Sequence, residues 1–187
     1  TAGVVVGAGL GVVLMATRGV NVISFTEPLQ LVTSGAEYES LYAIWKYVHG
    51  FTVYADHTRI PFAGSFYNWL YYVFYGEITK WILGALSLGD AWLPTITRLI
   101  TATGVVYGTL ITARLFLEFP AAGDDNLKRL GLAFALLIFF GPLMGFFGIA
   151  TQPDIWGFAF DVTAIYVFLR FYERRPMVGI GLFCLFA

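Results

Sequence analysis

The chain has 187 residues, of which 58% are hydrophobic and 12% are charged, whereas ordinary soluble domains carry about 25% charged residues. Its formal net charge of −1 gives no indication of a nucleic-acid partner, and its single cysteine excludes an intrachain disulfide framework and a multi-cysteine metal site. A soluble core of this size could not bury so much apolar surface, so the composition predicts an all-α integral membrane protein that contacts membrane lipid.

Several apolar segments have the composition of membrane helices, which need roughly 20 predominantly apolar residues to span the hydrocarbon core. The clearest is 130–150, which carries no charged side chain. The chain begins with Thr1 and ends inside an apolar run, so we expect one transmembrane domain over 1–187 that is truncated at both ends. Its expected helices, together a polytopic bundle, cover about 2–22, 92–117, 130–150, 155–172 and, in part, 177–187, with an outer loop at about 24–90.

Glycines recur at four-residue spacing in three of these segments, which places each set on one helix face where two backbones can approach closely. The same glycines could also reflect the ordinary composition of membrane helices. The sets are Gly3, Gly7 and Gly11, then Gly104 with Gly108, and Gly141 with Gly145.

The basic residues predict the orientation, because positively charged loops are retained on the cytoplasmic side of a membrane. Lys128 and Arg129 precede one apolar helix, and Arg170, Arg174 and Arg175 end another, so both clusters are expected to face the cytoplasm. The long segment that ends near Asp90 then lies outside, and its acidic residues outnumber its basic ones.

The outer segment predicts two helices that lie in the membrane interface, over about 37–48 and 67–86. In the first, Leu41, Ile44, Trp45 and Val48 repeat at the spacing of one apolar helix face. The second is rich in Tyr and Trp, which favour the depth of the lipid headgroups. Amphipathic helices of this kind lie along the membrane surface.

Glu37 and Glu39 begin the first of these helices. Residues two positions apart on an α-helix are rotated by about 200°, so only one of the two carboxylates can enter a given cleft. A carboxylate in a cleft can act as a general base, whereas a carboxylate in the first helical turn can simply complement the positive end of the helix.

The pattern Glu37-Tyr38-Glu39 soon after the first apolar helix resembles the acidic motif of the GT-C superfamily of polytopic glycosyltransferases, which includes the protein mannosyltransferases and the lipid A aminoarabinose transferases. The resemblance runs over about 34–175, although many members have an aspartate pair where this chain has two glutamates. It also rests on the run 41–45, on Gly50, Tyr54, Asp56, Pro61 and Tyr67-Asn68, on Arg98-Leu99-Ile100, and on Gln152-Pro153-Asp154.

The resemblance implies an inverting glycosyltransferase that moves a sugar from a polyprenyl-phosphate-linked donor to a glycan, lipid or protein acceptor. It also implies a site that faces the periplasm or exterior, as in a bacterial inner membrane. Such transfer needs a base for the acceptor hydroxyl and cations for the departing phosphate. The expected catalytic residues are Glu37 as first choice, Glu39 and Asp154, and the expected donor-binding residues are Arg98, Arg59, His57, Asp56, Tyr67 and Asp161.

Other interpretations stay open at this point. Asp154 and Asp161 share one helix face, and an acid within an apolar helix also marks the substrate or proton pathway of a transporter. The glycine-spaced faces would suffice for a non-catalytic membrane assembly subunit.

The sequence predicts no definite cofactor. His49, His57, Asp56 and the two glutamates could bind a divalent cation such as Mg²⁺, although their spacing matches no recognised metal signature.

Overall fold

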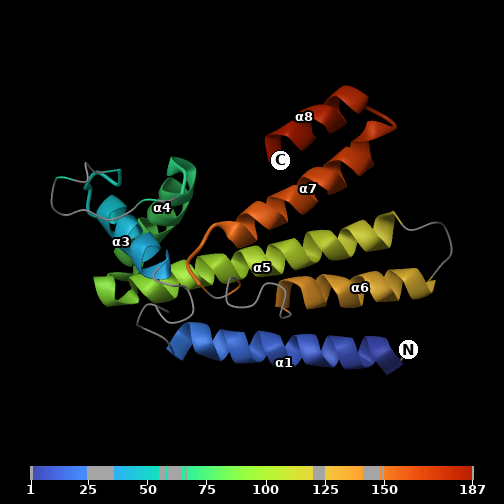
Figure 1. Ribbon diagram of the computed structural model, residues 1–187, viewed down its shortest axis with the longest axis horizontal. Helices are drawn as coiled ribbons and strands as arrows, with labels where there is room; N and C mark the ends of the chain where they lie inside the picture. Colours follow the sequence, from blue (N-terminus) through green and yellow to red (C-terminus); the bar gives the residue numbers. More distant parts are fainter. Residues whose placement is uncertain are drawn as a thin grey trace. The chain divides into compact units, whose positions relative to one another are not determined.

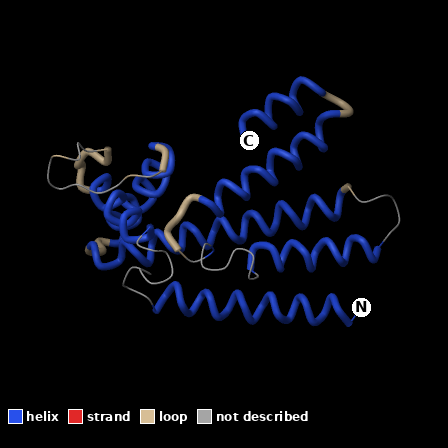
Figure 2. The backbone as a smooth tube through the Cα atoms, in the orientation of Figure 1, coloured by secondary structure: helices blue, strands red, loops and turns tan. Residues whose placement is uncertain are grey.

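A computed structural model of the chain describes residues 2–24, 36–54, 58, 65, 67–119, 125–140, 148 and 150–186. Within these ranges every regular element is a helix and none is a strand (Figures 1 and 2). The expectation of an all-α protein is therefore confirmed for the described part of the chain. The elements are α1 (Ala2–Ser24), α3 (Ala36–Val48), α4 (Trp69–Leu86), the 3-10 helix η1 (Asp90–Trp92), α5 (Leu93–Glu118), α6 (Asp125–Phe140), α7 (Asp154–Tyr172) and α8 (Pro176–Phe186).

Two helical stretches are long and apolar enough to cross a membrane, Asp90–Glu118 and Asp154–Tyr172, while Pro176–Phe186 is apolar but shorter. Core helices of soluble proteins can satisfy the same criteria, so these two stretches support membrane association without defining a bundle. The segment expected as a helix over 130–150 is described as α6 only up to Phe140, and Ala150 lies in a bend, while 141–147 lie outside the described residues.

The chain divides into two compact units, and the division falls within α1 and within α5. The first unit comprises residues 1–17, 103–148 and 154–187, and the second comprises 18–102 and 149–153.

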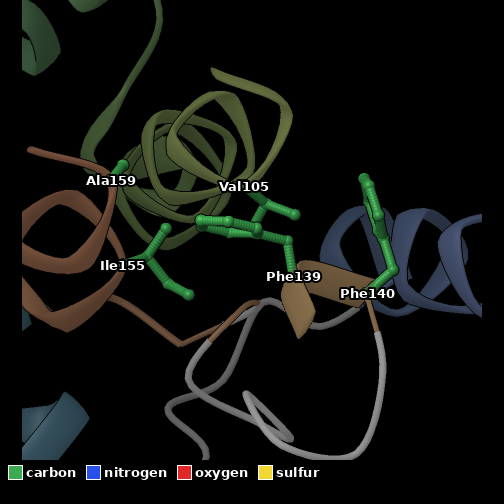
Figure 3. Close-up of a cluster of buried hydrophobic side chains, with 5 residues drawn as sticks. All are labelled: Val105, Phe139, Phe140, Ile155 and Ala159. Atoms are coloured by element: carbon green, nitrogen blue, oxygen red, sulfur yellow. The ribbon is translucent and has the colours of Figure 1, made fainter. Parts of the chain in front are cut away.

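The first unit has a hydrophobic core made by α5, α6 and α7. The ring of Phe139 on α6 lies between Val105 on α5 and Ile155 on α7, with Ala159 beside them (Figure 3). Phe139 and Ile155 are fully buried, and Phe140 completes the cluster. Burying such side chains is the main favourable contribution to packing of these helices when the surroundings are aqueous.

Glycines allow helices of the first unit to approach closely, and of the predicted glycine sets this holds for Gly104 and Gly108, while Gly141 and Gly145 lie outside the described residues. A Cβ atom built on Gly108 would lie 2.1 Å from Phe139 Cε1, and one on Gly131 would lie 2.3 Å from Phe116 Cγ. Gly7 and Gly11 of α1 face Ala133 and Leu136 of α6 at ordinary contact distance, Gly104 meets Ile155 and Trp156, and Gly3 meets no neighbour within 4 Å.

The second unit is organised around the pair α3 and α4, which correspond to the two helices expected in the outer segment. The Tyr47 ring of α3 packs against Gly76 of α4, where a Cβ atom would lie 2.2 Å from Tyr47 Cδ1, and the Tyr47 hydroxyl donates to Glu77 at 2.7 Å. Asn68 caps the start of α4 by accepting from the Tyr71 N–H at 3.1 Å. Leu41 and Ile44, on the predicted apolar face of α3, are buried.

The contact between Gly108 and Phe139 predicts the effect of adding one methyl group. Gly108→Ala should lower the free energy of unfolding by about 1–3 kcal/mol, because the buried Phe139 ring has no room to move away. Gly157→Ala is the matched control, since no atom lies within 4 Å of a Cβ there and Ala favours a helix over Gly by roughly 0.5–1 kcal/mol. Thermal unfolding of the full chain measures both, and equal effects of the two changes would contradict this packing.

Candidate functional site

The centre of the candidate site is a buried ion pair between Glu37 and Arg98. Glu37 stands in the first turn of α3 and is 0% exposed, while Arg98 stands in the second turn of α5 and is 1% exposed. Arg98 Nε donates to Glu37 Oε1 at 2.9 Å, and Arg98 Nη2 donates to Glu37 Oε2 at 2.9 Å. This parallel two-bond geometry is the strongest pairing that a guanidinium and a carboxylate form.

A third segment joins the ion pair. The backbone N–H of Thr151 donates to Glu37 Oε1 at 3.0 Å, so this carboxylate oxygen accepts two hydrogen bonds. The Thr151 hydroxyl also lies 2.9 Å from the hydroxyl of Thr97, one residue before Arg98. Residues that lie 61 and 114 positions from Glu37 along the chain therefore meet at its carboxylate in the second unit.

Two buried tyrosines of α4 hold the same segment from another direction. Tyr71 donates to the Thr151 carbonyl at 3.0 Å, and Tyr75, one turn later, donates to the Gln152 carbonyl at 3.2 Å. The Tyr75 hydroxyl also lies 2.9 Å from the hydroxyl of Thr101. Burial raises the pKa of Tyr71 well above its ordinary value, so its hydroxyl keeps its proton and remains a donor at neutral pH.

Of the two glutamates, only Glu37 is buried. Glu39 is half-exposed, and Tyr38 between them points outward. This difference agrees with the 200° rotation expected from helix geometry, which allows one carboxylate inside. Glu37, the first choice for a catalytic carboxylate, is therefore the one that meets Arg98.

The remaining predicted site residues fall in three groups. Tyr67 is half-buried in the second unit, where its ring packs edge-on against Tyr71 and its carbonyl accepts from Tyr54 at 2.6 Å. Asp154 and Asp161 belong to the first unit, and both side chains are exposed on α7. The third group, Asp56, His57 and Arg59, lies outside the described residues.

Other polar residues of the second unit make local contacts. Lys46 is buried and donates to the Val53 carbonyl at 3.1 Å. His49 and the indole N–H of Trp45 both meet Asp90 Oδ2, at 2.9 and 2.8 Å. In the part of the chain that the structure describes, no group of three or more His, Cys, Asp or Glu side chains is placed to hold a metal ion.

The sequence interpretation missed the hydroxyl groups that surround the ion pair. Their signal is the four-residue spacing of Tyr71 with Tyr75 and of Thr97 with Thr101, which places each pair on one helix face. In an apolar context such spacing reads as ordinary packing. The structure shows that these hydroxyls form one network, because the tyrosines of α4 and the threonines of α5 are joined by hydrogen bonds to each other and to the segment 151–152.

Comparison of the chain with protein-family models, with curated proteins and with solved structures found no match.

The buried ion pair predicts a strong dependence of each partner on the other. Arg98→Met should lower the free energy of unfolding by about 3–5 kcal/mol, because it leaves the Glu37 carboxylate buried without a counter-charge. The double variant Glu37→Gln/Arg98→Met should regain a large part of this loss, since Gln is neutral and can still accept from the Thr151 N–H. Denaturant unfolding of the full chain compares the three proteins.

The matched control is Arg170→Met, which removes the partner of Glu118 in an exposed pair at 3.7 Å. Exposed pairs contribute about 0–1 kcal/mol, so this change should have little effect. If the double variant were as unstable as Arg98→Met, the ion pair would not be the interaction that holds these helices together.

Proposed function

We propose that this chain is a polytopic membrane glycosyltransferase of the GT-C kind, which transfers a sugar from a polyprenyl-phosphate-linked donor to an acceptor on the non-cytoplasmic face. One observation carries the proposal. Three stretches that support the resemblance to this superfamily, around Glu37, Arg98 and Gln152, converge on a single carboxylate in the second unit. If the resemblance of these stretches to the superfamily were due to chance, there would be no reason for them to lie together in the structure.

In the proposed reaction the acceptor hydroxyl attacks the anomeric carbon of the donor sugar from the face opposite the phosphate. A bond forms between the acceptor oxygen and this carbon, and the bond from the carbon to the phosphate oxygen breaks, which inverts the configuration. Glu37 takes the hydroxyl proton as general base. The electron pair leaves with the lipid phosphate, whose negative charge Arg98 stabilises.

The two-bond contact with Arg98 determines when Glu37 can act. In the structure both carboxylate oxygens accept hydrogen bonds from Arg98 and the Glu37 side chain is fully buried, so an acceptor hydroxyl cannot reach the carboxylate in this state. A phosphate matches the guanidinium fork as well as a carboxylate does. When the donor phosphate takes over Arg98, Glu37 is released, and the base becomes available only in the presence of the donor.

The proposed membrane placement agrees with the exposed aromatic side chains of the second unit. Trp81 on α4 is 73% exposed, and Trp69 and Trp92 are also exposed, which is typical of rings at the level of lipid headgroups. We place α3 and α4 in the outer interface, as in a periplasm-facing site of a bacterial inner membrane, and the basic residues around Arg129 and Arg174 on the cytoplasmic side.

A transporter is the second candidate function, and Asp161 is the observation that favours it. Its carboxylate is exposed on α7, one of the two helices able to cross a membrane. Acids at such positions mark ion or substrate pathways in transporters. A transporter, however, gives no role to the convergence at Glu37, and neither does a non-catalytic assembly subunit.

Substitution of the two glutamates tests the catalytic proposal. Glu37→Gln keeps the size of the side chain and removes the base, so transfer from a polyprenyl-phosphate sugar should fall by about 10² or more, within the range of general-base contributions. Glu39→Gln is the matched control on the same helix turn and should retain most of the activity, because Glu39 is half-exposed.

The assay compares initial rates of transfer in membranes containing equal amounts of folded protein. A larger loss in Glu39→Gln than in Glu37→Gln would exchange their roles. If neither change lowered the rate in folded protein, the acidic motif would be a structural helix start and the catalytic proposal would fail.

Labelling of single cysteines tests the proposed orientation, in a Cys184→Ser background that removes the natural thiol. Lys80→Cys on α4, which is exposed, should react with a membrane-impermeant maleimide from outside intact cells, whereas Arg129→Cys and Arg174→Cys should react only after the cells are opened. Labelling of Arg129→Cys from outside would reverse the topology and remove the proposed location of the site.

A further inference from the structure

The backbone around Gln152 is held in place on several sides. The Thr151 N–H donates to Glu37, the Thr151 carbonyl accepts from Tyr71, and the Gln152 carbonyl accepts from Tyr75. All of these residues belong to the second unit, and the Gln152 side chain is only 3% exposed. The direction in which the Gln152 side chain leaves the backbone is therefore set by α3 and α4.

The side-chain oxygen of Gln152 has no hydrogen-bond partner among the described residues, although the backbone of this segment is fixed. Among the described residues, the buried side-chain oxygens without a hydrogen-bond partner include Gln152 Oε1, and Thr79 Oγ1 on α4 is another. Proteins pair the great majority of their buried polar atoms, because an unpaired one loses its bonds to water and gains none in return. Replacing Gln152 by an apolar residue therefore breaks no hydrogen bond to Oε1 within the described structure.

We propose that the Gln152 carboxamide is a ligand-binding group that takes a hydroxyl of a neutral, polyhydroxylated ligand, namely the sugar of the donor. The proposal rests on the proposed glycosyltransferase function and adds a residue that recognises the sugar. The family resemblance assigned the catalytic and phosphate-binding roles to Glu37, Arg98 and Asp154, whereas Gln152 had no role.

The chemistry of the carboxamide favours a hydroxyl over other groups. Gln152 Oε1 only accepts, so it cannot pair with a phosphate or carboxylate oxygen, which only accept as well. A hydroxyl both donates and accepts, and it therefore satisfies either atom of the carboxamide. Because Gln152 is nearly inaccessible, the ligand enters only when covering residues move, and its association should be slow.

The first part of the test uses Gln152→Leu without ligand, in the full chain in lipid nanodiscs. The melting temperature should stay unchanged or rise, because the variant removes an unpaired buried acceptor. Tyr75→Phe is the matched control, since it removes a hydroxyl that bonds to the Gln152 carbonyl and to Thr101, and it should lower the melting temperature. A fall of more than about 3 °C in Gln152→Leu would show that the carboxamide is satisfied within the protein or by a structural water, and would overturn the inference.

The second part compares the melting-temperature shifts caused by undecaprenyl phosphate and by undecaprenyl phosphate that carries a hexose or a pentose. The wild-type chain should respond more strongly to at least one sugar-bearing lipid than to the bare lipid. Gln152→Leu should bind that sugar-bearing lipid about tenfold more weakly and keep its response to the bare one.

The outcomes separate the two proposals. A response to undecaprenyl phosphate that no sugar increases, or a preference for the sugar that survives in Gln152→Leu, would overturn the role of Gln152 and leave the glycosyltransferase proposal standing. The absence of any response to all of these lipids would count against the donor class, and both proposals would then fail.

Discussion

The pairing of two buried charges is the constraint on which the second unit depends. A carboxylate and a guanidinium taken out of water lose several kcal/mol of hydration each, and only close, well-directed contact offsets this loss. Glu37 and Arg98 meet that condition through two hydrogen bonds of 2.9 Å. Because both side chains are inaccessible, a shift of α3 along α5 by one residue would leave two unpaired charges. The ion pair thus selects one register between these helices, whereas apolar contacts alone would tolerate several.

The hydroxyl groups around the pair follow from the same constraint. A carboxylate has more lone pairs than one guanidinium can satisfy, and the Thr151 N–H supplies a further donor to Glu37. Thr151 lies in a bend outside the helices, and Tyr71 donates to its carbonyl. Tyr75 does the same for the next carbonyl and is itself fixed by Thr101. A non-helical segment can be buried in this way because side chains, rather than a helix or sheet, satisfy its backbone.

Local patterns predicted much of the helical structure, and tertiary pairing explains what they could not predict. The helices at 93–118 and 154–172 follow from apolar composition, and the helix at 36–48 follows from the spacing of Leu41 and Ile44. Helix geometry also predicted that only one of Glu37 and Glu39 lies inside. The partner of Glu37 lies 61 residues away, and no local pattern reports contacts over that distance, so the sequence does not predict that Arg98 pairs with Glu37. Composition likewise extended one helix to 150, although Ala150 lies in a bend.

The two unusual polar features of the site demand different properties of a ligand. The Glu37–Arg98 pair is electrically neutral and closed, so a ligand gains from it only by supplying an anion that replaces the carboxylate. Gln152 is buried and uncharged, and its Oε1 has no hydrogen-bond partner among the described residues, so a ligand hydroxyl can donate to it. Both are joined through the backbone of Thr151, which bonds directly to Glu37 and immediately precedes Gln152. A movement of Glu37 on release from Arg98 would therefore be transmitted to the residue that we propose to hold the sugar. A molecule that carries a phosphate next to a polyhydroxylated ring satisfies both demands together, whereas a phosphate or a sugar alone satisfies one.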